Sequence, residues 1–194
     1  MTPDATVDIR TLPARERVLA TALALFYRDG IRATGIDRVI AEAGVTKVTF
    51  YRHFPSKDAL VVAFLESRHE RWMAWFRDAL ARHAARAGAD RVRALGAALR
   101  EWFATPAYRG CAFVNSVVEL GGTSPEVLAI ARRHKRDMTA VIAGLMPPRV
   151  GRAWRARALA VAVDGAIVRA QIDGSPDDAL EALNAVIGAL VRAE

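Results

Sequence analysis

The stretch IDRVIAEAGVTKVTFYRHF, residues 36–54, decides how this chain is interpreted. Two short segments with apolar residues at helical spacing flank Gly44, and the second ends in hydroxyl, basic and aromatic side chains. The small side chains of Ala41 and Ala43 let two helices approach closely, and glycine lets the chain reverse between them. The pattern predicts a helix-turn-helix.

The second helix of this motif is expected to begin near Thr46, whose hydroxyl can cap it. It should stop before Pro55, because the residue preceding proline disfavours helical geometry. At about 100° per residue, Phe50 falls on one side of the helix, with Thr46 and His53 beside it. The opposite side carries Lys47, Val48, Tyr51 and Arg52. The projection predicts an inward anchor at Phe50 and an exposed face.

The side chains on that face have the chemistry that binds DNA. Lys47 and Arg52 can donate to guanine O6 and N7 or to phosphate, and Val48 can contact a thymine methyl. Hydroxyl groups that can donate to phosphate belong to Thr46, Thr49 and Tyr51. Lys57, at the start of the next helix, can reach the same DNA phosphate backbone. The alternative is that the run is only a solvated helix face.

Apolar spacing is helical along almost the whole chain, which predicts an all-α fold. Thr34, with Asp37 three residues later, is expected to cap the first helix of the motif, and Ser56 a long helix after it. The predicted helices cover residues 14–28, 34–44, 46–54, 56–84, 90–104, 110–121, 125–146, 152–172 and 176–192. We expect a flexible tail at 1–12, a three-helix DNA-binding domain at 13–55 and a helical body at 56–194.

Composition narrows the class of protein. Cys111 is the single cysteine among 194 residues, so no internal disulfide can form. The first dozen residues lack the apolar core of a signal peptide, and Asp164 and Arg169 interrupt the most apolar late segment. We therefore expect a cytoplasmic protein with no membrane partner. The net charge of +7 favours an anionic partner, but residues 1–60 hold nine Lys/Arg against seven Asp/Glu, so charge alone locates no site.

The segment from 15 to 66 resembles the DNA-binding domain of TetR-family transcriptional regulators. The residues that carry the resemblance are Thr34, Ile40, Ala41, Ala43, Gly44, Val45, Thr49, Tyr51, His53, Phe54, Ser56 and Lys57, within TGIDRVIAEAGVTKVTFYRHFPSKDALVVAFLE. The resemblance implies that the bases are contacted by Lys47, Val48 and Arg52. It implies that phosphates are held by Thr34, Thr46, Thr49, Tyr51, His53 and Lys57. Val48 and Phe50 depart from the small residue and the leucine common there.

The same resemblance implies that the body dimerises and holds a small effector. The predicted helices at 152–172 and 176–192 are rich in alanine, glycine and β-branched residues, which permit close helix packing. They are expected to form a homodimer as a four-helix bundle, unless they only close the monomer's own core. A dimer would place two reading helices about 34–36 Å apart on a palindromic operator.

An effector pocket is predicted from the aromatic and soft side chains of the body. Asn115 and Glu119 lie one turn apart on an otherwise apolar helix, and a ligand is one partner for such polar groups; backbone or solvent is another. Trp75 and Phe113 could contribute further apolar surface. The predicted pocket residues are Trp72, Phe76, Trp102, Phe103, Cys111, Asn115, Glu119 and Met138. Cys111 could sense oxidants or simply fill the core.

No motif in the chain indicates catalysis, a cofactor or a metal ion. The four histidines show no metal-ligand spacing, and His134, in ARRHKRD, is interpreted as part of a solvated face. The sequence therefore predicts a ligand-responsive regulator that binds double-stranded DNA as a homodimer. We expect a repressor that a small, largely apolar effector releases. The alternatives are a small all-helical enzyme and a basic DNA-coating protein that needs no effector.

Overall fold

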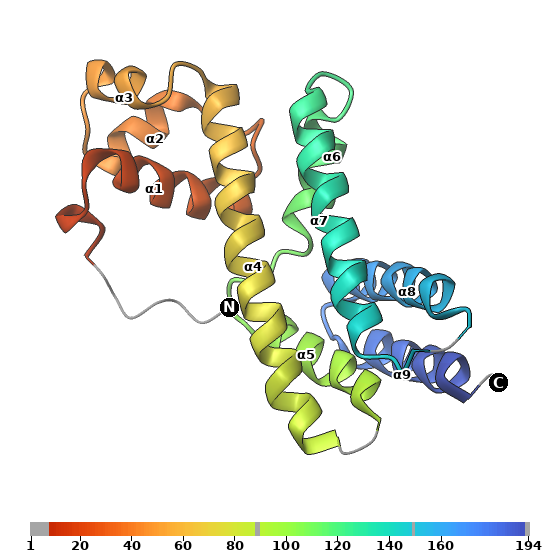
Figure 1. The fold of residues 1–194 in the computed structure, drawn as a ribbon. Coiled ribbons are helices and arrows are strands. Elements are labelled where there is room, and N and C mark those ends of the chain that lie inside the picture. The colour runs from red at the N-terminus through yellow and green to blue at the C-terminus, as the bar shows by residue number, and fades with distance from the viewer. Residues whose placement is uncertain (1–7, 88–89, 149, 193–194) are drawn as a thin grey trace. The chain divides into compact units, whose positions relative to one another are not determined.

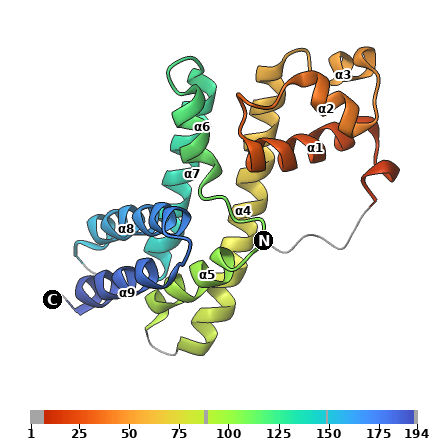
Figure 2. The same cartoon turned by 180° about the vertical axis from the view of Figure 1, so that it is seen from behind.

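The computed structural model describes residues 8–87, 90–148 and 150–192, and Figures 1 and 2 show it from opposite sides. Over these residues the regular elements are helices without any strand, so the all-α prediction is confirmed. None of the helices in these ranges has both the length and the apolar character that crossing a bilayer requires. The elements are η1 (Ile9–Thr11), α1 (Ala14–Asp29), α2 (Ile36–Ala43), α3 (Lys47–His53), α4 (Lys57–Ala87), η2 (Arg91–Arg93), α5 (Ala94–Phe103), α6 (Ala112–Leu120), α7 (Pro125–Gly144), α8 (Arg152–Ile172) and α9 (Asp177–Arg192).

The chain divides into two compact units, and the division falls within α4. The head unit holds the described residues up to Glu70 together with Ala112–Ala131. The body unit holds Arg71–Cys111 and the described residues from Arg132 onward. This division differs from the boundary predicted between residues 55 and 56, because α6 and the first part of α7 group with the N-terminal helices.

The head unit is built around α1, which contacts both α2 and α3, as the grouping of these helices in Figure 1 shows. Phe26 on α1 meets Phe64 on α4 edge to face, with ring centroids 5.5 Å apart. Both side chains are buried. Two aromatic rings in this arrangement bury a large apolar area, and the pair ties the start of α4 to the helices before it.

Local signals set several helix ends as predicted, with one correction. Ser56 accepts the Ala59 N–H at 3.0 Å and caps α4, and Gly44 ends α2 with φ of 62°. Thr34 does not cap α2, so that prediction is wrong. Gly35 is the capping residue, and the Thr34 hydroxyl instead donates to the Gly30 carbonyl at 2.7 Å.

The N-terminal tail predicted at 1–12 contains a short ordered element. Asp8 accepts the Arg10 N–H at 3.0 Å through its side chain and begins η1. Residues 1–7 of the predicted tail lie outside the described residues.

The body unit is organised by α8 and α9, which run side by side in both views. Gly96 on α5 faces the Asn184 side chain of α9, whose Oδ1 would lie 2.4 Å from a Cβ added at Gly96. Arg100 on α5 pairs with Asp177 at the start of α9, at 2.7 Å. These contacts join α5 to α9.

A half-buried ion pair links α7 to α8. Lys135 Nζ lies 2.5 Å from Asp164 Oδ1 and 3.5 Å from the Cys111 sulfur. Burial disfavours the charged ammonium, but attraction to Cys111 and Asp164 and hydrogen bonds to both outweigh it, so the pKa of Lys135 is raised. The ion pair is thus maintained at neutral pH.

We expect Asp164→Ala to lower the free energy of unfolding by about 2 kcal/mol at pH 7, because it leaves the Lys135 charge without its partner. Since the folded-state pKa of Lys135 is raised, the ion pair stabilises fully below the ordinary value of 10.5 and less as the pH rises further. Urea unfolding at pH 7 and at higher pH measures both effects. The double change Lys135→Met with Asp164→Leu should recover most of the loss; equal destabilisation by the double change would contradict this account.

Candidate nucleic-acid interface

Helix α3 begins at the predicted cap. Thr46 accepts the Thr49 N–H at 3.2 Å, and the two hydroxyl oxygens lie 2.9 Å apart. This cap satisfies one of the N–H groups that a helix start leaves without a partner. The prediction that Thr46 caps the helix is confirmed.

Phe50 anchors α3 in the core of the head unit, as predicted. Its side chain is completely buried, and its ring meets Tyr51 edge to face at 5.2 Å and Phe54 at 6.1 Å. Phe54 is itself buried, with the Arg15 guanidinium 5.3 Å from its ring centroid. This packing fixes which side of the short helix faces outward.

The outward side carries most of the predicted DNA-binding residues. Val48 is 71% exposed although it is apolar, and Tyr51 is 41% exposed. Lys47 is also exposed, with its Nζ 3.7 Å from an Asp37 carboxylate oxygen. Of the remaining predicted residues, Thr46, Arg52 and His53 are exposed, whereas Thr49 and Lys57 are half-buried. The structure thus gathers hydroxyl, basic and apolar groups on and beside one short helix.

Thr34 does not belong to this surface. Its side chain is fully buried, and its hydroxyl donates to the Gly30 carbonyl. A buried side chain in this position cannot contact phosphate, so the prediction for Thr34 is wrong. Its role is to close the turn between α1 and α2.

Arg17 supports the turn of the motif, and the sequence did not point to it. Its guanidinium donates to the carbonyls of Ala43 at 3.2 Å, Gly44 at 3.4 Å and Leu12 at 3.2 Å. The carbonyls at the end of α2 need donors once the helix stops. A sequence can show that need, but it does not show that a side chain 26 residues away meets it.

Within the head unit, the Glu119 side chain is held by backbone N–H groups of the turn after α1. Its carboxylate, near the end of α6, accepts the N–H of Ile31 at 3.2 Å and the N–H of Arg32 at 2.7 Å. Gly30 precedes these residues with φ of 92°, and a Cβ there would lie 3.3 Å from the Glu119 carboxylate. The prediction of Glu119 as an effector contact is therefore replaced by a structural role.

The other predicted pocket residues fall in two groups. Asn115 is half-buried and belongs to the head unit. The body unit holds Trp72, Phe76, Trp102, Phe103, Cys111 and Met138, all of them buried. The predicted set is therefore divided between the two units.

Within the body unit the aromatic rings form one cluster around Trp72. The Trp72 ring stacks on Phe76 at 4.6 Å and meets Trp102 edge to face at 5.5 Å. His134 also lies against Trp72, at 4.9 Å, and is buried, so its interpretation as part of a solvated face is wrong. The Trp72 Nε1–H is buried without an acceptor among the described residues. An indole N–H normally finds a partner when it is buried.

The described residues contain no cluster of three or more histidine, cysteine or carboxylate side chains placed to hold a metal ion.

Comparison with known proteins identifies the family. Residues 18–64 match the family model described as bacterial regulatory proteins of the tetR family. The crystal structure of SCO4454, a TetR-family transcriptional regulator from Streptomyces coelicolor, is 30% identical with a TM-score of 0.77. The match covers 92% of this chain and 90% of that one. This chain belongs to the TetR family.

Three other proteins show weaker or shorter similarity to this chain. The regulator UidR of Escherichia coli is 32% identical over 66 residues, which cover 34% of each chain. YerO of Bacillus subtilis, an HTH-type transcriptional regulator, is 40% identical over 52 residues, 27% of this chain and 18% of that protein. The multidrug binding protein EbrR, solved with malachite green, shares the fold at 23% identity and a TM-score of 0.70 over 92% of this chain and 98% of its own.

We expect Glu119→Gln to loosen the α1–α2 turn, because one carboxylate oxygen is replaced by an amide N–H₂ that faces one of the two N–H donors and cannot accept from it. Amide hydrogen exchange at Ile31 and Arg32 should accelerate about tenfold, while exchange in α9 stays unchanged. Glu126→Gln, at an exposed acidic position of the same unit, is the matched control. Unchanged protection at both amides in the Glu119 variant would show that the contact does not hold the turn.

Proposed function

We propose that this protein is a transcriptional regulator that binds a palindromic DNA operator as a homodimer and responds to a small molecule. The observation that carries the proposal is the exposed face of α3, presented by the buried Phe50 within a helix-turn-helix. An apolar side chain as exposed as Val48 has no role in the head unit's own packing. Membership of a family of transcriptional regulators favours this function over the enzymatic alternative.

The residues of this face fall into two groups, according to whether they are assigned to base edges or to phosphates. Lys47, Val48 and Arg52 project from the helix surface and are assigned to base edges in the major groove. The flanking residues Thr46, Thr49, Tyr51, His53 and Lys57 are assigned to phosphates, which position the helix but carry no sequence information. The Phe50 contact holds the Tyr51 ring on edge, which restricts where its hydroxyl can lie.

Dimerisation is assigned to α8 and α9 because α8 exposes an apolar stripe. Its members recur at alternating spacings of four and three residues, which is the repeat of a helix packed along a partner helix. They are Trp154, Ala158, Val161, Gly165, Val168 and Ile172. Val161 is 72% and Ile172 68% exposed, and a Cβ added at Gly165 would meet nothing within 4 Å. On α9, Val186 is 38% exposed between exposed alanines.

The effector is assigned to the aromatic cluster of the body unit. Trp72 and Phe76 lie on α4, and the same unbroken helix carries Phe64, which packs on α1 in the head unit. A ligand that shifts α4 would therefore act directly on the reading head. Because the Trp72 Nε1–H has no acceptor among the described residues, we expect a largely apolar ligand that carries a hydrogen-bond acceptor.

If the ligand-bound form holds the two reading helices at the wrong spacing, the effector releases the protein from DNA. The protein would then be a repressor whose action the effector ends. Effector and DNA then oppose one another by equal coupling free energies. The alternative of a DNA-coating protein without an effector is disfavoured by the size of the body, which sequence-neutral coating does not need. Equal affinity for selected and random duplexes would support that alternative.

We expect Lys47→Ala and Arg52→Ala each to weaken binding about tenfold or more to a duplex selected by the wild-type protein from a random library. Fluorescence anisotropy at fixed salt measures the loss. Lys57→Ala should instead weaken binding to all duplexes alike and make the salt dependence shallower. Arg157→Ala, an exposed change in the body unit, should leave affinity unchanged. Full affinity in both α3 variants would refute the assignment of the reading helix.

We expect Val161→Glu to convert the protein from dimer to monomer, because it places a charge in the middle of the exposed stripe on α8. Light scattering coupled to size exclusion measures the mass in solution. Val150→Glu is the matched control, since Val150 is 98% exposed and lies outside the stripe. A Val161 variant that remains dimeric would show that another surface joins the subunits.

A further inference from the structure

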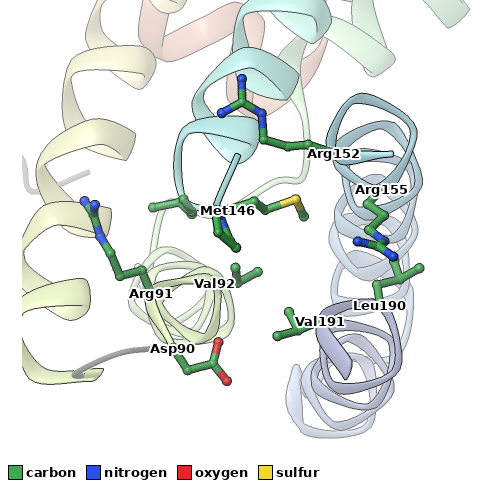
Figure 3. Close-up of a pocket in the computed structure, with 10 residues that line it drawn as sticks. Asp90, Arg91, Val92, Met146, Arg152, Arg155, Leu190 and Val191 are labelled. Atoms are coloured by element: carbon green, nitrogen blue, oxygen red, sulfur yellow. The ribbon is translucent and has the colours of Figure 1, made fainter. Parts of the chain in front are cut away.

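A pocket of about 300 Å³ in the body unit is lined by residues of η2, the turn after α7, the start of α8 and the end of α9 (Figure 3). The guanidinium groups of Arg91, Arg152 and Arg155 stand around it and point in different directions. They therefore do not converge on one ligand group. Two charged side chains that do converge lie in the head unit, Asp37 at the start of α2 and Lys47 at the start of α3.

Asp37 has no capping role in the structure. Gly35 rather than Thr34 precedes α2, so the capping box expected from the sequence does not form. The Asp37 side chain is 89% exposed, and the one partner of its carboxylate among the described residues is Lys47, whose Nζ lies 3.7 Å from Oδ1. An ion pair between two exposed side chains contributes little to the stability of a fold. The carboxylate is therefore available to a partner outside the chain.

A carboxylate in this place has a cost if α3 enters DNA. Lys47 is assigned to a base edge, so Asp37 beside it also comes close to the DNA, whose phosphates repel it. The repulsion is offset only where the carboxylate accepts from an N–H group of a base. In the major groove these groups are the N4 amino group of cytosine and the N6 amino group of adenine.

The neighbouring ammonium group favours cytosine over adenine. Guanine offers Lys47 two acceptors, O6 and N7, and the cytosine N4 amino group lies beside O6 in the same base pair. An ammonium and a carboxylate 3.7 Å apart can therefore meet one G·C pair from the same side. In an A·T pair the thymine beside the adenine N6 amino group offers only one acceptor, O4, next to its methyl group.

We propose that Asp37 and Lys47 together read one G·C pair in each half of the operator. Lys47 donates to guanine O6 and N7, and Asp37 accepts from the cytosine N4 amino group. This inference rests on the proposed function of α3 and adds Asp37 to the residues that determine specificity. Because phosphates repel Asp37 at every sequence and only the cytosine compensates, Asp37 lowers the affinity for random DNA and raises discrimination.

Selection from a random duplex library by the wild-type protein and by Lys47→Ala locates the base pair. The wild type should enrich a site with a G·C pair in each half, and Lys47→Ala should lose the preference at that pair. A selected site in which no G·C preference depends on Lys47 would overturn the pairing with Asp37 and leave the proposed function standing. No enriched site at all would overturn both.

A base analogue then tests the contact made by Asp37. In one duplex the cytosine of this pair is replaced by 2-pyrimidinone, which lacks the 4-amino group and leaves guanine unchanged. By fluorescence anisotropy at fixed salt, the wild type should bind this duplex about tenfold or more weakly than the natural one, because the carboxylate has lost its donor. Asp37→Ala should bind the two duplexes alike. An equal loss in both proteins would show that Asp37 does not contact the cytosine.

Glu42→Ala is the matched control, because it removes an exposed carboxylate from the same helix, one paired with Arg38. It should discriminate against the analogue as the wild type does. Asp37→Ala should also bind random duplex at least as tightly as the wild type, and weaker binding by the folded variant would contradict the repulsion inferred for Asp37. Circular dichroism establishes folding. If Asp37→Ala does not fold, Asp37→Asn, which keeps the size of the side chain without its charge, should discriminate less than the wild type.

Discussion

The burial of Phe50 is the constraint on which the exposed face of α3 depends. A helix of seven residues has too few hydrogen bonds to persist alone. Phe50 compensates by burying its whole side chain, and Tyr51 and Phe54 pack against the same ring. Once that side of α3 is held inward, the opposite positions can only face solvent, so the core of the head unit presents Val48 and its neighbours.

The turn between α1 and α2 is held by a second set of contacts, and those made by Glu119 come from far along the chain. The backbone reverses at Gly30, and the Thr34 hydroxyl donates to the Gly30 carbonyl. The Glu119 carboxylate accepts the N–H groups of the two residues that follow Gly30. Helix α6 is thereby tied to the turn that follows α1. A carboxylate that accepts two N–H bonds makes a strong, directional contact, so it fixes the backbone of that turn.

The helices and their ends could be predicted from the sequence because those signals are local. Helical periodicity, Thr46 and Ser56 as caps and glycine at 44 depend on neighbours within one turn, and all appear in the structure. The predictions for Glu119 and His134 are wrong because packing sets their partners, and the partners of Glu119 lie 88 and 87 residues away. Thr34 differs, because its partner is local: its hydroxyl donates to the Gly30 carbonyl four residues before it instead of capping α2. A polar residue on an apolar helix shows that a partner is needed, and only the fold shows which one.

The contacts of Glu119 also change which polar groups are left for the proposed effector. Both oxygens of the Glu119 carboxylate accept N–H groups of the head unit, so this carboxylate is no longer assigned to the proposed effector. Among the described residues of the aromatic cluster, the polar group that lacks a partner is a donor, the Trp72 Nε1–H. The proposed effector would satisfy this buried donor only with an acceptor atom of its own.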